Sequence, residues 1–566
     1  MATGMQDFVA AGGPATVLDE IKPYKIHVSS RYLDLTKQKL EITRLPHEIE
    51  EPRSRDWWQP KSHVEPLIDF WLEQYQWREQ EEAFNNELPQ FRTGFAIPYA
   101  ETSIRLHFIH VRSSHQNAIP LLLIPPFPFT NLSLGHLVKP FTEPDDVANN
   151  QPFHLVIPSL PGLGFSDALP TNSAVISTTA DMLDLLMKRL DYPHYLVTNS
   201  GTATASPAEI DYKLVEYLSI QYSDSCLGTH FISPPLAQPK IQEAPLEWAK
   251  WSIASFFEAP ILGYRTEDFS ALRHNGYTPS SKKSATPKQF GLNRLGLTEP
   301  NTLAYALCDS PTGLLVFAMK GLRTLAPQKQ FTPTEIINFA QLAWLPGPEA
   351  AMRFWAHCSQ HPEKIEKKKK STTRPWVSVT VFLGKEQQGA TNLQGENVAD
   401  VEVTIPKLPS AGEHAYSCPS WARTKYNVLH ANRASGTPGL LAWERPEIIA
   451  AGVRGLASAL LKIDQRLKPE GGRPAPVPLQ QVTVATPSAE GDFTSFPSGP
   501  ATPAADNDLL APPSSIAQRL QPSREISDDT KVASDENLVT IAGKTPSPIP
   551  SPSPVYLAEP TASGDE

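Results

Sequence analysis

The sequence predicts an α/β fold built on a largely parallel sheet. Four short apolar runs have the length and composition of buried strands, at residues 118–126, 153–162, 194–200 and 376–384. A helical pattern, "STTADMLDLLMKRLDY", lies between the second and the third run. Continuous apolar strands that alternate with helices are typical of a parallel sheet covered on both faces.

Length and composition narrow the class of protein. The chain has 566 residues, 40% of them hydrophobic, which predicts two folded units plus additional segments. The net charge of −10 argues against a broad nucleic-acid-binding surface. The four cysteines are far apart and lack paired metal-ligand spacing, so we expect reduced thiols, no metal site and no cofactor.

The first twenty residues have no basic segment followed by an apolar run, so the sequence does not predict a secretory signal. Since a membrane helix needs about 20 consecutive apolar residues and none of the runs reaches that length, we expect no membrane span. We therefore expect a cytoplasmic protein, and nothing in the sequence indicates its oligomeric state.

Residues 22–118 have the pattern of a helix followed by a strand. An amphipathic helix is predicted within 64–91, and its aromatic stripe is interpreted as packing rather than a cofactor site. The alternating segment "IRLHFIHVR" (104–112) predicts a strand. In the later helical pattern, Met182, Leu183, Leu186 and Leu190 share one face, and Thr178 or Thr179 is the expected N-cap.

The last hundred residues, 466–566, are dominated by Pro, Ser, Thr, Ala and Asp. Such a composition buries too little apolar surface to offset chain entropy, so we expect a disordered tail. Its Ser-Pro steps and PxxP pattern could serve a partner, although a plain tail is the favoured interpretation. The Lys367–Lys370 run is likewise interpreted as a solvated loop rather than an import signal.

Candidate chemistry lies where the predicted strands end, because ligands of open α/β sheets bind outside the carboxyl ends of strands. Three such ends are "LIPPFPFT" (123–130), "PSLPGLGFSD" (158–167) and "TNSGTAT" (198–204). In the third, a strand stops at a turn of small residues. This layout is typical of a nucleophile elbow, in which a sharp turn exposes one side chain above the sheet.

Several long motifs give the chain a resemblance to microsomal-type epoxide hydrolases over residues 22–463. They are "WLEQYQWREQEEAFNNELPQF", "VIPSLPGLGFSD", "QYSDSCLGTHF", "LTEPNTLAYALCDSPTGLL" and "GLLAWERPE", in the family's order. The resemblance implies an α/β-hydrolase fold with a helical cap at about 237–370. It also implies an N-terminal meander domain at 22–118, a hydrolase domain at 119–465, and disordered ends at 1–21 and 466–566.

The family mechanism uses an elbow aspartate as nucleophile, two cap tyrosines as hydrogen-bond donors, and a histidine oriented by an acid. Aligning the motifs puts the nucleophile position on Gly201 and the base position on Gly439. The cap tyrosine positions fall on Leu292 and Trp355. The resemblance therefore predicts that the reacting side chains have been replaced while the surrounding motifs remain.

Two further elements of the family site are only partly retained. In the oxyanion segment the central proline survives as Pro128, along with the backbone N–H groups of Phe127 and Thr202. Glu413 and Glu386 both fit the acid position, and the sequence leaves the choice between them open. Either one is expected to be a surface carboxylate if there is no histidine to orient.

Ser200 is the one nearby candidate for a substitute nucleophile, one residue before the expected position. Its neighbours at two residues on either side, Thr198 and Thr202, are β-branched and poorly suited to a strained elbow. His430, His414 and His357 are the possible bases by sequence order. His230 matches a family position that is structural.

Removing one member of a hydrolase triad costs on the order of 10⁴–10⁶ in rate. We therefore favour a catalytically degenerate epoxide hydrolase-like protein with an apolar pocket that binds a hydrophobic small molecule. The alternatives are an active epoxide hydrolase that forms diols, an esterase that uses Ser200, and a scaffold that acts through its tail.

Overall fold

The structure is a computed structural model that describes residues 20–47, 60–202, 206–274, 299–325, 329–363, 365, 374–384 and 416–467. All of them belong to one compact unit, Met1–Pro487, and a second unit, Ser488–Glu566, lies outside the described residues. Also outside are the N-terminal end up to residue 19, Leu292, the Lys367–Lys370 run, Glu386, His414 and Glu413.

The described residues form a mixed sheet of nine strands in the order β1-β2-β3-β5-β4-β6-β7-β8-β9. The strands β4 to β9 run parallel to one another, while β1, β2 and β3 extend the β5 edge in antiparallel pairs. The predicted α/β fold is thereby confirmed. The strand bounds are β1 Lys22–Pro23, β2 Gln90–Phe95, β3 Ile104–Val111, β4 Ile119–Ile124, β5 Phe153–Pro158, β6 Tyr195–Asn199, β7 Cys226–Ile232, β8 Trp376–Phe382 and β9 Asn427–Ala434.

Helices cover both faces of this sheet, and α10 to α13 lie next to its carboxyl edge. Their bounds are α1 Ser30–Glu41, α2 Lys61–Glu73, α3 Trp77–Glu87, α4 Val138–Thr142, α5 Val175–Arg189, α6 Ile210–Gln221, α7 Pro245–Phe257, α8 Thr266–His274, α10 Pro300–Asp309, α11 Pro311–Leu325, α12 Pro333–Trp344, α13 Glu349–Gln360, α14 Leu441–Glu444 and α15 Pro446–Leu460. No single helix among the described residues is long and apolar enough to cross a membrane; α10 and most of α11 pass that test by length and composition only as a pair bent by 113°.

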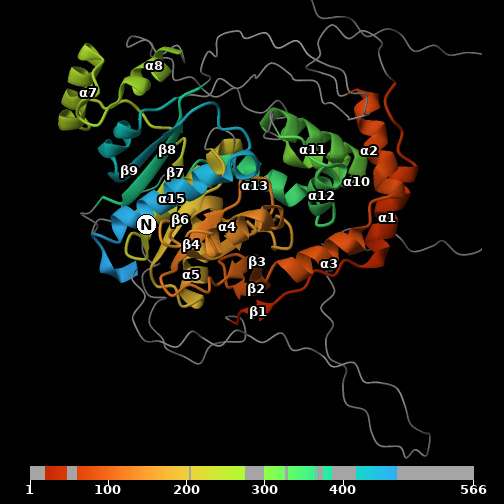
Figure 1. Cartoon of the computed structure of the whole chain (residues 1–566). Coiled ribbons are helices and arrows are strands. Elements are labelled where there is room, and N and C mark those ends of the chain that lie inside the picture. Colours follow the sequence, from red (N-terminus) through yellow and green to blue (C-terminus); the bar gives the residue numbers. More distant parts are fainter. Residues whose placement is uncertain are drawn as a thin grey trace, which may run out of the picture. The chain divides into compact units, whose positions relative to one another are not determined.

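Each face of the sheet has its own hydrophobic core because side chains alternate along every strand. In β4, Leu122 and Ile124 pack in the cluster that includes α5 and α6, whereas Leu121 and Leu123 pack in the cluster that includes α4 and α15. Figure 1 shows α15 lying across the sheet. Each fully buried leucine contributes about 1.5–3 kcal/mol relative to an exposed one, so the two layers hold the strand ends in place.

The helix predicted within 64–91 is two helices, α2 and α3, separated by a break at residues 74–76. Because of the break, the aromatic residues of the two helices pack in different hydrophobic clusters. Trp71 packs with α11 and α12, whereas Trp77 packs in the cluster that includes α4 and α15. The hydroxyl of Tyr75, at the break, donates to Asn338 Oδ1 at 2.7 Å. The interpretation of the stripe as packing is confirmed, and Figure 1 shows α1 and α2 beside α10, α11 and α12.

Helix α5 is confirmed, but the predicted N-cap is wrong. The N-cap residue is Ala174, and Thr179 lies inside the helix with its hydroxyl donating to Val175 O at 2.7 Å. The first N–H groups are satisfied instead by Glu363, whose carboxylate accepts from Ile176 N at 2.7 Å and from Ser177 N at 3.0 Å. A cap supplied by a residue so distant in sequence leaves no local signal.

Candidate functional site

The segments that follow β4 and β6 meet at the carboxyl edge of the sheet. The two strands are parallel neighbours, and Ile124 at the end of one is paired with Asn199 at the end of the other. The backbone carbonyl of Ile124 accepts hydrogen bonds from Ser200 N at 3.1 Å and from Ser200 Oγ at 2.7 Å. These bonds bring the predicted oxyanion segment beside the predicted nucleophile turn.

The turn after β6 differs from a sharp nucleophile elbow. Helix α6 begins only at Ile210, so ten residues separate it from the end of the strand at Asn199. Gly201 does not have a positive φ, and its carbonyl accepts from Asn199 Nδ2 at 2.6 Å. The same Asn199 accepts from Ile232 N at 3.3 Å through Oδ1. The turn is therefore held by an asparagine rather than tightened by the immediate start of a helix.

The space beside Gly201 is already occupied by other residues. A Cβ atom on Gly201 would lie 2.9 Å from Pro126 Cβ, closer than real Cβ contacts allow. It would also lie 3.5 Å from Oδ2 of Asp211. A carboxyl group therefore lies close to the position where the family's aspartate would project, but it comes from a different residue.

Asp211 lies in the first turn of α6 and is fully buried. Its Oδ1 accepts a hydrogen bond from Phe127 N at 3.0 Å, whereas Oδ2 is buried without a hydrogen-bond partner. Burial raises the pKa of Asp211 to about 7, although the Phe127 N–H and the nearby Ser206 hydroxyl act in the opposite direction. Because a buried carboxylate is costly without full pairing, this environment favours the neutral acid.

Our sequence-based interpretation did not identify Asp211. The signal that could have found it is a helical pattern in "IDYKLVEYLSI", where Leu214, Val215 and Leu218 are buried. Asp211 precedes them by three, four and seven residues, so it lies on the same face of the helix. A carboxylate on an apolar helix face is unusual and indicates a special environment.

The predicted base position is also filled. Gly439 has a φ of +61°, and a Cβ atom there would lie 1.6 Å from Oε2 of Glu444. The Glu444 carboxylate is held by Leu440 N at 3.0 Å and by Lys329 N at 3.1 Å. A histidine at this position would need a left-handed backbone conformation and would have to displace the Glu444 carboxylate from these hydrogen bonds.

Ser200 and His430 have separate hydrogen-bond partners. The Ser200 hydroxyl donates to Ile124 O, whereas His430 Nδ1 lies 3.2 Å from Ser378 Oγ in the neighbouring strand β8. The His430 ring lies against α15, since a Cβ atom on Gly455 would come within 2.6 Å of it. His430 thus faces the helix that covers the sheet, and nothing in these contacts connects it to Ser200.

His230 is likewise held within the sheet layer. Its Nδ1 lies 2.9 Å from Thr198 Oγ1 and its Nε2 lies 2.8 Å from Thr380 Oγ1. Burial lowers the pKa of His230 to about 3, with His430 as a minor contributor. Both ring nitrogens are engaged by threonine hydroxyls, as expected of a structural histidine. The third candidate, His357, lies in α13, and burial lowers its pKa.

A large cavity lies between the strand ends and the helices α10–α13. It encloses about 1230 Å³ of space, its opening included, and Trp355 from α13 lies in its wall. The polar side chains among its described lining residues are Thr130 and Ser133, together with the indole of Trp355. Such a wall suits an apolar molecule. Leu292, the other predicted cap position, lies outside the described residues.

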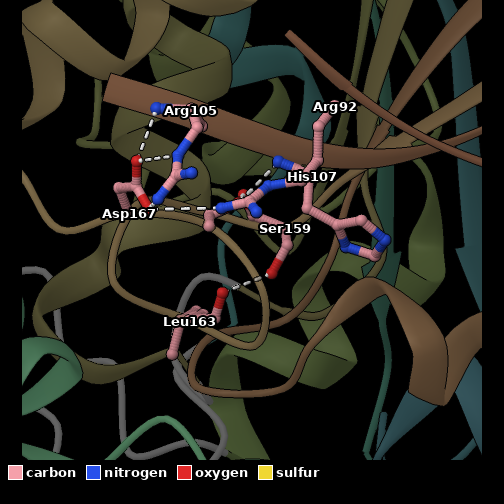
Figure 2. A network of polar contacts seen from close by, with 7 residues as sticks. Arg92, Arg105, His107, Ser159, Leu163 and Asp167 are labelled. Atoms are coloured by element: carbon pink, nitrogen blue, oxygen red, sulfur yellow. Dashed lines mark hydrogen bonds and ion pairs between the residues drawn. The ribbon is translucent and has the colours of Figure 1, made fainter. Parts of the chain in front are cut away.

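The loop after β5 forms part of the cavity wall through Gly162, Leu163 and Gly164. Figure 2 shows the polar network that fixes it. Asp167 Oδ2 accepts from Arg105 N and Nε, both at 2.9 Å, and its Oδ1 lies 3.2 Å from an Arg92 nitrogen. Ser159 Oγ donates to Leu163 O at 2.8 Å. The antiparallel strands β2 and β3 thus anchor this wall.

A smaller recess adjoins the cavity and contains the predicted nucleophile and base positions. Its walls include Gly201, Thr202, Ser206, Asp211 and Gly439. It encloses about 260 Å³ including its opening, with room for about one water molecule. The recess and the cavity share three wall residues, Phe127, Phe129 and Leu325. In the described part of the chain, no group of three or more His, Cys, Asp or Glu side chains could hold a metal ion.

Comparison with known proteins shows a similarity of this chain to epoxide hydrolases. The family model described as "Epoxide hydrolase N terminus" matches residues 21–134. A protein called "Putative epoxide hydrolase" from Stigmatella aurantiaca is 26% identical over 356 residues, which cover 60% of this chain and 70% of that protein. The juvenile hormone epoxide hydrolase of Bombyx mori is 24% identical over 460 residues, 76% of this chain and 85% of that one.

Solved structures have the same fold at low identity. The Aspergillus niger epoxide hydrolase aligns with a TM-score of 0.54 at 18% identity, covering 78% of this chain and 97% of that chain. The Bombyx mori juvenile hormone epoxide hydrolase aligns with a TM-score of 0.56 at 19% identity, covering 78% and 95%. These alignments support the α/β-hydrolase fold.

Proposed function

We propose that this chain, which is similar to epoxide hydrolases and has the α/β-hydrolase fold, has lost the family chemistry and binds a hydrophobic small molecule. The observation that carries the proposal is the occupied space at both replaced positions. Pro126 crowds Gly201, with Asp211 at ordinary contact distance, and Glu444 fills the space beside Gly439. A change at one position could be a local variation, but two filled positions indicate a site adapted to another use.

The loss of the family reaction follows from the chemistry that each position would supply. Gly201 has no side chain to form the ester intermediate, and Gly439 has no imidazole to activate water. At one predicted cap position, Trp355 has an indole N–H but no phenolic hydroxyl. Loss of a nucleophile and a base together leaves only binding and backbone donors, whose residual effect is at most about 10³–10⁴-fold over water.

Retention of binding is supported by the cavity. Its described walls are predominantly apolar, as is typical of sites that bind small apolar molecules. The loop 158–167 that borders it is fixed by charged hydrogen bonds to β2 and β3. A pocket kept in shape by such contacts is suited to hold a ligand without reacting with it.

The test is an assay of the purified full chain with styrene oxide and stilbene oxide. We expect no diol above the uncatalysed rate, with the Bombyx mori juvenile hormone epoxide hydrolase assayed alongside as the active comparison. Diol formation at rates typical of enzymes, about 1–10³ s⁻¹, would overturn the proposal in favour of an active epoxide hydrolase.

A further inference from the structure

The buried carboxyl of Asp211 has no role in the family reaction as aligned on this chain, yet it lies in the recess between the two replaced positions. Its Oδ1 is fixed by Phe127 N at 3.0 Å. Its Oδ2 is 3.5 Å from where a Gly201 side chain would begin and has no hydrogen-bond partner. We propose that Asp211 replaces the missing elbow side chain as the polar anchor for a ligand whose apolar body fills the large cavity.

The position of Oδ2 supports this role. The recess that Asp211 lines shares Phe127, Phe129 and Leu325 with the cavity, so a ligand in the cavity lies next to the recess. The recess has room for about one water molecule, which one ligand atom could replace. An unpaired buried carboxyl oxygen gains a hydrogen bond when such an atom arrives, and this gain favours binding.

The chemistry of the carboxyl group selects the kind of ligand. Burial favours the neutral acid, with the pKa of Asp211 raised to about 7, so Oδ2 can carry the proton and donate it in a hydrogen bond. The partner is then a neutral oxygen acceptor, such as a carbonyl or an ether oxygen. The ligand class is an apolar molecule ending in such an oxygen. A cationic amine is the alternative if the carboxylate is the binding form.

This inference rests on the proposed function, because it assumes that the cavity binds an apolar molecule. Three probes of one shape separate the two claims: propylbenzene, propiophenone and 1-phenylpropylamine. Their dissociation constants are measured by titration calorimetry at pH 5.5 and pH 8.5. We expect the protein to bind propiophenone about five- to tenfold more tightly than propylbenzene at pH 5.5. The preference should shrink at pH 8.5, where the donor proton is lost.

Two variants test whether the Asp211 carboxyl causes the preference for propiophenone. Asp211→Leu should bind both neutral probes equally, since it has no donor. Asp211→Asn retains an N–H donor at the same place, so it should keep the ketone preference and lose the pH dependence. The asparagine variant also keeps an acceptor for Phe127 N, so it tests the proposal even if the leucine variant does not fold.

The remaining outcomes decide against the proposal. Equal binding of the two neutral probes at pH 5.5 would overturn the anchor while leaving the apolar ligand site intact. Tightest binding of 1-phenylpropylamine would overturn the neutral-acceptor class. Thr130 lines the cavity with an unpaired buried hydroxyl; loss of the ketone preference in Thr130→Val but not in Asp211→Leu would assign the anchor to Thr130. No binding of either neutral probe would overturn the binding function itself.

Discussion

The carboxyl of Asp211 accepts a hydrogen bond from the backbone N–H of Phe127 at 3.0 Å. This N–H is one of the two donors predicted for the oxyanion hole. The contact therefore connects the predicted oxyanion segment to the helix that follows the predicted nucleophile turn. A group of the protein itself thus occupies one of the two donors predicted to bind a substrate oxygen.

The stability of the protein should depend on pH through Asp211. Its folded pKa of about 7 lies above the ordinary unfolded value of about 3.9. The folded state holds the Asp211 proton up to a higher pH than the unfolded state does. The contribution of Asp211 to the free energy of unfolding is therefore complete below pH 4 and is lost as pH rises to about 7. The slope is at most about 1.4 kcal/mol per pH unit. Urea unfolding of the native protein and Asp211→Asn from pH 4 to 8 measures the difference.

Buried histidines act in the opposite direction, because burial lowers the pKa of His107 and His230 to about 3. Their contribution is present above the unfolded value of about 6.5 and is lost as pH falls. They are the same in both proteins, so the difference between the curves isolates Asp211. Parallel curves over the whole range would contradict the raised pKa.

Adding a side chain at Gly439 should destabilise the protein for steric reasons. A side chain at Gly439 must adopt a φ of +61° and displace the Glu444 carboxylate, so Gly439→Ala should cost at least about 1–3 kcal/mol. Removing Glu444 relieves the clash. The double variant Gly439→Ala/Glu444→Ala should therefore be more stable than the sum of the single effects predicts, with a coupling of about 0.5–3 kcal/mol. Strict additivity in urea unfolding would show that Glu444 is not the obstacle.

Ser200 should behave as a structural residue. Its hydroxyl donates to Ile124 O at 2.7 Å, and its N–H donates to the same oxygen. Ser200→Ala should therefore lower the free energy of unfolding by only about 1 kcal/mol, since the carbonyl keeps one donor. A serine-reactive phosphonate should leave Ser200 unlabelled in mass spectra, with acetylcholinesterase labelled alongside as the positive control. Stoichiometric labelling of Ser200 would favour the esterase.

Asp167 should control the order of the cavity wall. It bonds Arg105 and Arg92, so Asp167→Asn removes charge-assisted hydrogen bonds from a partly exposed group and should cost about 1–2 kcal/mol. Amide hydrogen exchange at residues 159–164 should become faster, while exchange in α15 stays unchanged. If the loop exchanges at the native rate, the backbone bonds of Ser159 and Asp167 are sufficient to hold it.

The sequence by itself determined the fold class. Apolar runs predicted β4, β5, β6 and β8, because a buried strand needs continuous apolar residues, and the helix α5 followed from its spacing. The motifs also located the positions where the family's reacting side chains would stand. The break between α2 and α3 at residues 74–76 was not predicted, because it depends on the packing of the two helices in two different hydrophobic clusters.

Only the tertiary structure decided what fills those positions. Phe127 and Asp211 are 84 residues apart, and Lys329 is 115 residues from Glu444, yet each pair shares a hydrogen bond. No local pattern encodes such contacts, because they depend on how strands and helices pack around the carboxyl edge of the sheet. The sequence therefore predicts which side chains Gly201 and Gly439 lack, whereas packing decided that Asp211 and Glu444 lie next to these two glycines.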